Sequence, residues 1–252
     1  MKIILSPAKK MNGEADGLAW RSLPLFLEQA QQLCDRLRGM SYDELKKLWG
    51  CNDAIARLNF DRLQRMDLRR ALVPALLAYE GIQYQYMAPG VLTEAGYAYL
   101  EEHLRILSGF YGLLRPFDGV TPYRLEMQAK LQIGQAKDLY SFWDGRIADA
   151  LCADTGWILN LASKEYSLCV SRHRDPAVPM ITCVFGELRQ GKVVEKGTLC
   201  KMARGEMVRY LAENQIEDPE RIKAFCGQNY HYAPQYSTDT LWTFLRGASA
   251  EK

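Results

Sequence analysis

Residues 104–127 combine three arginines with glycine-containing turns, a combination that could bind an anion. The residues concerned are Arg105, Gly109, Gly112, Arg115 and Arg124. Glycine allows the backbone to turn sharply and expose N–H groups, and arginine offers several donors to a phosphate or carboxylate. The alternative is a glycine-capped helix followed by an ordinary surface turn, and the spacing supports the two interpretations about equally.

Two short apolar segments, residues 2–5 and 157–161, each lead through small residues to a lysine. The residues that follow the two segments are Ser6, Lys9, Ser163 and Lys164. In open α/β sheets, ligands gather at the carboxyl ends of strands, and lysine suits phosphate there as a point charge. Two exposed loop lysines would explain the pattern equally well.

Charged side chains recur at two further places. If residues 122–127 are extended, Arg124 and Glu126 share one face and form either an ion pair or a charged wall of a site. Lys201 and Arg204 are neighbours near the start of a predicted helix, where cations oppose the helix dipole. A nearby anion would offset that repulsion, which favours an anion-binding role for the second pair.

Motifs for metal binding and nucleophilic catalysis are missing from the sequence. The three histidines (His103, His173 and His231) do not stand in an E-x-x-H or H-x-x-x-H arrangement, and no cysteine or histidine spacing is typical of zinc. There is no G-x-S-x-G, no P-loop and no G-x-G-x-x-G after a predicted strand. We therefore predict no metal site and no cofactor.

The composition is that of an ordinary globular chain of 252 residues with a net charge of +2. This charge excludes a protein that is basic throughout, although it allows a local basic patch. The first apolar run is too short for a signal peptide, and no run approaches the length of a membrane span. Seven cysteines without a C-x-x-C pair indicate reduced thiols, and we expect a cytoplasmic protein without a membrane partner.

The periodicity of apolar residues predicts a mixed α/β fold. Predicted helices cover residues 22–39, 41–49, 52–80, 93–107, 141–151, 201–214 and 218–227. Predicted strands cover residues 2–5, 157–161, 180–185 and 192–196, and the tail at 228–246 could add another. Because no linker or repeat divides the chain, we predict one domain over residues 1–252, with a small mixed sheet and surrounding helices.

Seven short motifs occur in the order expected of the YaaA peroxide-stress proteins, and the chain resembles that family over nearly its whole length. They lie at residues 6–9, 107–112, 114–118, 122–127, 139–143, 160–166 and 203–205. Three places depart from the family pattern. Residues 80–84 lack an expected lysine and aspartate, Met202 replaces the second lysine of a pair, and Gln128 replaces a glycine.

The resemblance implies a cytosolic bacterial protein that protects against hydrogen peroxide by limiting free iron and the damage it does to DNA. It also implies a basic cleft and a helix-hairpin-helix-like element that binds DNA, which we place at residues 103–114. DNA would be held mainly through its phosphate backbone, by a protein expected to be monomeric.

Two hypotheses follow for the cleft. In the first, it binds DNA phosphates through seven cations. These are Lys9, Arg105, Arg115, Arg124, Lys164, Lys201 and Arg204. In the second, the protein is an enzyme acting on a nucleotide or nucleic-acid phosphate, with Glu126, Glu165 and Tyr166 as candidate catalytic residues. Direct iron sequestration is disfavoured by the lack of ligand spacing.

Overall fold

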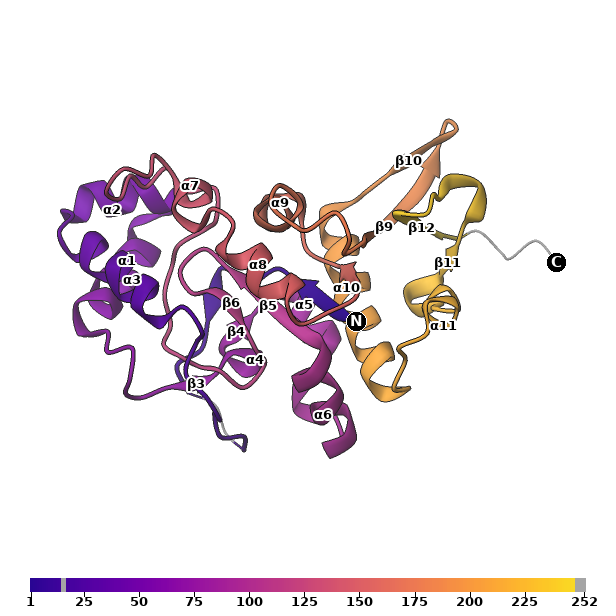
Figure 1. Cartoon of the computed structure of the whole chain (residues 1–252). Helices are drawn as coiled ribbons and strands as arrows, with labels where there is room; N and C mark the ends of the chain where they lie inside the picture. Colours follow the sequence, from indigo (N-terminus) through magenta and orange to yellow (C-terminus); the bar gives the residue numbers. More distant parts are fainter. Residues whose placement is uncertain (15–16, 248–252) are drawn as a thin grey trace.

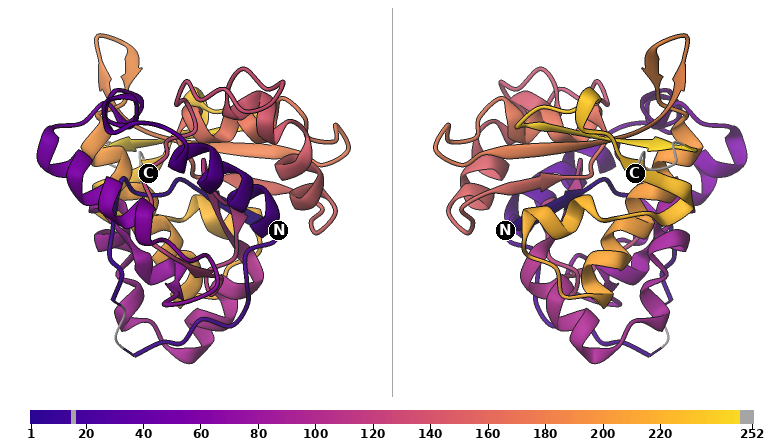
Figure 2. Two further views of the ribbon diagram at one scale, coloured as in Figure 1. Left: turned by 90° about the vertical axis from the view of Figure 1, so that its left-hand side faces the viewer. Right: turned by 90° about the vertical axis from the view of Figure 1, so that its right-hand side faces the viewer.

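An eight-stranded mixed sheet joins segments from both halves of the chain (Figure 1). The computed structural model describes residues 1–14 and 17–247. The strands of this sheet are β1 (Lys2–Leu5), β5 (Leu104–Ser108), β6 (Gly112–Leu114), β8 (Ile158–Asn160), β9 (Met180–Arg189), β10 (Lys192–Val194), β11 (Tyr230–Tyr232) and β12 (Leu241–Arg246). Their order is β11-β12-β9-β8-β1-β5-β6, and β10 pairs with β9 as a hairpin that projects from the body of the molecule (Figure 2).

The centre of the sheet is parallel. Strand β1 pairs in parallel with β5 on one side and with β8 on the other, and Leu5 lies opposite Ile106 in this register. All residues of β1 are buried, as is typical of a parallel strand covered on both faces. The carboxyl ends of β1, β5 and β8 therefore lie at the same edge of the sheet.

Helices surround the sheet within the described part of the chain. They are α1 (Leu27–Arg38), α2 (Tyr42–Trp49), α3 (Asp53–Arg65), α4 (Ala75–Ala78), α5 (Ile82–Met87), α6 (Glu94–His103), α7 (Leu139–Trp143), α8 (Arg146–Cys152), α9 (Lys164–Ser171), α10 (Gly197–Glu213) and α11 (Pro219–Lys223). Helices α1–α3 form one end of the molecule, and α10 and α11 lie at the other with β9–β12 (Figure 1). None of these helices combines the length and apolar character needed to cross a bilayer.

Two small antiparallel strand pairs lie outside the main sheet. One joins β2 (Lys10–Met11) to β4 (Tyr79–Glu80), and the other joins β3 (Val73–Pro74) to β7 (Gly119–Val120). The predicted single mixed α/β domain is confirmed. The helix predicted at residues 41–49 is present as α2, and a capping box at Ser41–Glu44, with both reciprocal hydrogen bonds formed, begins it.

Several predicted helices are too long, two of them by more than a few residues or into a strand. The helix predicted at residues 93–107 ends at His103, because residues 104–108 form strand β5, and the one predicted at 52–80 ends at Arg65. All five residues of β5 are buried, and the strand pairs with β1 and β6. A short apolar run of this kind is compatible with the last turn of a buried helix or with a buried strand. Hydrogen bonding to the neighbouring strands decides which of the two forms.

The helix-hairpin-helix-like element placed at residues 103–114 is wrong, because this segment is a β-hairpin. Ser108 pairs with Gly112 across the turn between β5 and β6. Two consecutive short helices occur earlier, where α5 is joined to α6 by a 3-10 turn at Pro89–Val91. Val91 in this turn is 68% exposed.

The packing of α10 against α5 depends on a glycine. A Cβ atom at Gly205 would overlap the carbonyl oxygen of Gln83 and lie 3.0 Å from the backbone nitrogen of Met87. Because these are backbone atoms within a helix, they cannot move aside without separating the two helices. The absence of a side chain at Gly205 thus sets how closely α10 approaches α5.

We predict that Gly205→Ala lowers the free energy of unfolding by about 3 kcal/mol or more, since overpacking against backbone is poorly relieved. Gly197→Ala, on the same helix, is the matched control, because a Cβ atom at Gly197 would meet nothing within 4 Å. It should change stability by less than about 1 kcal/mol. Urea denaturation measures both, and equal midpoints for the two variants would contradict the packing argument.

Candidate functional site

A cavity of about 530 Å³ opens at the carboxyl ends of β1 and β8. We call it the strand-end cavity. Its walls come from residues 6–10, 80–83 and 123–126, from Ser163, Glu165 and Tyr166, and from Lys201 and Arg204 of α10. The parallel strands bring the first and last of these loops together, as expected for a ligand site in an open α/β sheet.

Many of the residues proposed from the sequence line this cavity. They are Ser6, Lys9, Arg124, Glu126, Ser163, Glu165, Tyr166, Lys201 and Arg204. The cavity therefore contains every candidate catalytic residue and four of the candidate cations. Lys164 is exposed at the first position of α9 and is not among the lining residues.

Hydrogen bonds tie the two strand ends together at the base of the cavity. The backbone N–H of Ser163 donates to Ser6 Oγ at 2.8 Å, and Ser6 Oγ donates to Ser163 Oγ at 3.2 Å. The carbonyl of Ser6 accepts from Gln83 Nε2 and Tyr84 Oη at 2.9 and 3.0 Å. Ser163 is also the N-cap of α9, so the positive end of that helix dipole lies at the cavity.

A charged wall is formed around Glu126. Lys9 Nζ lies 2.7 Å from Glu126 Oε2, and Arg124 Nη2 lies 3.7 Å from Glu126 Oε1. Along residues 123–127 burial alternates, so that Arg124 and Glu126 face the site while their neighbours pack into the core. The prediction that these two side chains share one face is confirmed.

Two arginines of the cavity keep an unused donor. The Arg124 side chain is only 10% exposed, and Arg204 Nη2 lies 3.7 Å from Glu195 Oε1. Among residues 1–14 and 17–247, the buried Nε atoms of both arginines find no hydrogen-bond partner. Because buried donors are normally satisfied, this arrangement indicates a place for an anion.

Glu165 and Tyr166 provide groups that could hold or move a proton. The backbone N–H of Gln128 donates to Glu165 Oε1 at 3.3 Å. Burial raises the pKa of Glu165, and the negative charge of Glu126 raises this pKa further. Burial also raises the pKa of Tyr166.

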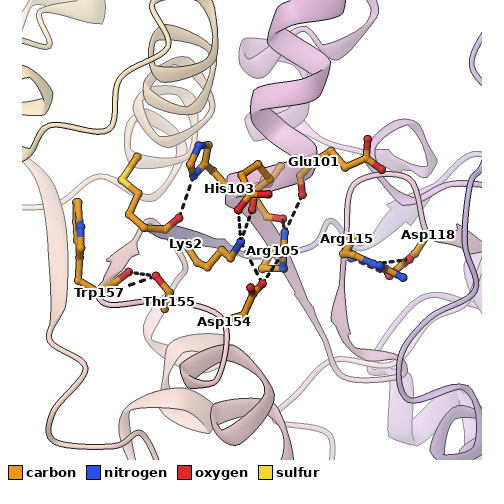
Figure 3. A network of polar contacts seen from close by, with 12 residues as sticks. Lys2, Glu101, His103, Arg105, Arg115, Asp118, Asp154, Thr155 and Trp157 are labelled. Carbon is orange, nitrogen blue, oxygen red and sulfur yellow. Dashed lines mark hydrogen bonds and ion pairs between the residues drawn. The ribbon is translucent and has the colours of Figure 1, made fainter.

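Arg105 does not belong to this cavity, contrary to the expectation from the sequence. It lies at the amino end of β5, where Arg105 Nη2 is 2.9 Å from Asp154 Oδ2 and Arg105 Nη1 donates to two backbone carbonyls (Figure 3). The buried Lys2 shares Asp154 at 3.1 Å. A strand rises about 3.3 Å per residue, so residues 105 and 109 lie at opposite ends of β5.

Arg115 is also paired away from the cavity. Its Nε lies 3.2 Å from Asp118 Oδ1, and its backbone N–H donates to Asp118 Oδ2 at 2.8 Å (Figure 3). Asp118 is buried and accepts from Ser22 Oγ as well. The expectation that all seven cations share one cleft is therefore wrong, since Arg105 and Arg115 each have a local structural partner.

The structure also contradicts the expected anion site at the turn after β5. Ser108 Oγ accepts from the backbone N–H groups of Phe110 and Tyr111, at 3.1 and 2.8 Å, so these amides are occupied. A Cβ at Gly109 would lie 2.7 Å from the Leu125 carbonyl oxygen. Gly112 has a φ of +73° and packs against Trp143. The turn thus supports the segment that carries Arg124 and Glu126.

Tyr123, which was not among the site residues predicted from the sequence, lines the cavity beside Arg124. Tyr123 Oη lies 2.8 Å from Tyr79 Oη and 2.7 Å from Ser108 Oγ. Burial raises the pKa of Tyr123 to about 12. Its position within the motif at 122–127 was visible, but its partners come from two distant segments.

The fold and this cavity define a class: a mixed α/β protein with a cationic site at the carboxyl ends of parallel strands. Residues 1–236 match the family described as "Peroxide stress protein YaaA". The chain is 52% identical over 252 residues to a "UPF0246 protein" of Desulfitobacterium hafniense, with both chains fully covered. It is 51% identical over 249 residues to a "UPF0246 protein" of Lachnoclostridium phytofermentans, covering 99% and 98% of the two chains. The chain belongs to the YaaA peroxide stress protein family, and the resemblance found in its motifs is confirmed.

We predict that Glu165→Gln removes a pH-dependent cost to stability. A carboxyl whose pKa is raised in the folded state binds its proton more tightly there than in the unfolded chain. The free energy of unfolding therefore falls as pH rises from 4.5, the ordinary pKa of the group, through its higher pKa in the folded state. The variant, which cannot ionise at this position, should gain stability relative to the parent between pH 4 and pH 7. Urea denaturation at the two pH values measures this, and a constant difference would contradict the assignment.

Proposed function

We propose that this protein binds DNA through its phosphate backbone at the strand-end cavity and so helps limit iron-dependent peroxide damage. The observation that carries the proposal is the pair Arg124 and Arg204. Within the described part of the chain, each keeps a buried Nε without a partner. Lys201 and Lys9 lie at the same cavity and add positive charge. The family name supports a role in peroxide stress.

We further propose that α5, the turn at Pro89–Val91 and α6 form the DNA-binding helical hairpin. Helix α5 begins beside the cavity, because Gly81, Ile82 and Gln83 line it, and ends at the exposed turn. Two helices joined by a glycine-containing turn are a common nucleic-acid-binding arrangement. The turn backbone and the cavity cations would contact successive phosphates of one strand. Such contacts position DNA without selecting its sequence.

We predict that Arg204→Gln weakens binding of a labelled duplex and lowers the slope of log K against log salt concentration by about 0.9, the value for one lost phosphate contact. Fluorescence anisotropy over a series of salt concentrations measures both quantities. Arg209→Gln is the matched control, because Arg209 lies on the same helix, carries the same charge and pairs with Glu213 at 2.7 Å. Binding that does not depend on salt, or equal slopes for the two variants, would contradict the proposal.

A second candidate function is cleavage of a nucleotide or nucleic-acid phosphate ester. It is favoured by Glu165, which burial keeps more readily protonated, beside the cations of the same cavity. In this reaction, water forms the new P–O bond while Glu165 gives its proton to the leaving oxygen, and the water proton passes to Glu126. Lys9 and Arg124 would stabilise the charge on the phosphoryl oxygens.

We predict that, if this reaction occurs, Glu165→Gln lowers turnover at least 100-fold while duplex affinity stays within twofold. The assay follows the release of product from nucleoside monophosphates and short oligonucleotides. Glu213→Gln on α10 is the control, because Glu213 lies outside the strand-end cavity. The absence of product with the parent protein, under conditions where it binds DNA, would leave binding as the function.

A further inference from the structure

A second cavity, of about 700 Å³, adjoins the strand-end cavity. We call it the Trp49 cavity. Lys9, Arg124 and Glu126 line both cavities, so these side chains form a charged wall that the two cavities share. The far side of the Trp49 cavity comes from the end of α2 and from residues 128–130. A ligand longer than a phosphate ion can therefore extend from one cavity into the other.

The Trp49 cavity differs in chemistry from the strand-end cavity. Trp49 is 6% exposed, and in the described residues its buried indole Nε1 has no hydrogen-bond partner. Met40 and Leu48 give the cavity an apolar side, and Gln128 adds an amide. Its remaining lining includes the charged side chains of Glu44, Lys47 and Lys130. A flat ring with hydrogen-bond acceptors fits such a site, because it can lie against the apolar side chains and accept from the indole.

The position of Trp49 is well determined by its surroundings. It is the last residue of α2, and Gly50 ends that helix with a φ of 54° in the left-handed region. The capping box at Ser41 secures the opposite end of the helix. An indole held in this way has a fixed position, so little conformational entropy is lost when a ligand packs against it.

The geometry points to a nucleotide as the ligand that spans both cavities, with its phosphate in the strand-end cavity and its base in the Trp49 cavity. This inference rests on the proposed phosphate binding at Arg124 and Arg204. The unpaired donors at the two ends of the combined site suit different partners. The guanidinium groups suit an anion, and the indole N–H suits a neutral hydrogen-bond acceptor. A 5′-phosphorylated nucleoside supplies both, as a free nucleotide or as an unpaired nucleotide of DNA.

Lys9 is placed to respond to such a ligand. It lies 2.7 Å from Glu126 at the boundary of the two cavities, and its side chain is 65% exposed. A phosphate next to Glu126 would compete for the Lys9 ammonium, and the exposed side chain can turn toward it at little cost. The ion pair therefore does not block passage between the two cavities.

The test compares AMP with ribose 5-phosphate, which lacks only the base, by isothermal titration calorimetry. The parent protein should bind AMP about tenfold more tightly, the gain expected from one hydrogen bond and ring contact. Trp49→Phe keeps a ring and removes the N–H, so it should reduce this preference without changing the affinity for ribose 5-phosphate. Trp20→Phe is the control, because Trp20 is 41% exposed and lines neither cavity.

Equal affinities of the parent protein for AMP and ribose 5-phosphate would overturn the inference, and that comparison needs no variant. If the two affinities were equal but duplex binding still depended on salt concentration, the proposed DNA binding would stand and the nucleotide site would not. If neither small ligand nor duplex bound, both proposals would fail together. An unchanged preference for AMP in Trp49→Phe, with an unfolding midpoint like that of the parent, would also overturn the assignment of the base to this cavity.

A second arm identifies the source of the base. A duplex with one unpaired 2-aminopurine is compared with the fully paired duplex, using the fluorescence of the probe base and the anisotropy of a terminal label. Tighter binding of the unpaired duplex, lost in Trp49→Phe, supports an unpaired nucleotide of DNA as the ligand. A preference for AMP without a preference between the duplexes supports a free nucleotide in the same site.

Discussion

Parallel pairing of β1 with β5 and β8 is the constraint on which the rest of the molecule depends. It places three carboxyl ends at one edge of the sheet, and the loops that leave them must share the space beyond that edge. Ser6 and Ser163, 157 positions apart in the chain, are hydrogen-bonded there as a result. The segment after β6 returns to the same edge because Gly109 lets it approach the β5 turn closely.

Charged side chains are paired differently at the amino and carboxyl ends of these parallel strands. At the amino end, Lys2 and Arg105 converge on Asp154, and Arg105 Nη1 donates to two backbone carbonyls. This group is self-contained and stabilises the packing of β1 against β5. At the carboxyl end, Arg124 and Arg204 contact carboxylates only at 3.7 Å and, among the described residues, retain buried Nε groups without partners. The second arrangement is suited to receiving an anion, since its donors are already desolvated and held in place.

Much of the secondary structure could be predicted because the caps and the apolar periodicity that specify it lie within a few residues of each other in the sequence. The helix that follows Ser41 and the strand at residues 2–5 appear in the structure where the sequence predicted them. Residues 104–108 could not be assigned correctly, because a buried apolar run satisfies helix and strand patterns alike. Residues 104–108 form a strand because β1 and β6 pair with it on its two sides. Strand β1 is distant in the sequence, and β6 comes after it, so neither partner is visible in the local pattern.

The sequence by itself determined the family, the mixed α/β class and the residue types available for binding an anion. Tertiary structure alone decided which arginines are available for that role. Arg105 and Arg124 stand in neighbouring motifs and carry the same charge, yet one lies beside Asp154 and the other beside a cavity. The reason is that the electrostatic role of a side chain depends on partners within a few ångströms, and those partners are brought in from distant parts of the chain by the pairing of strands.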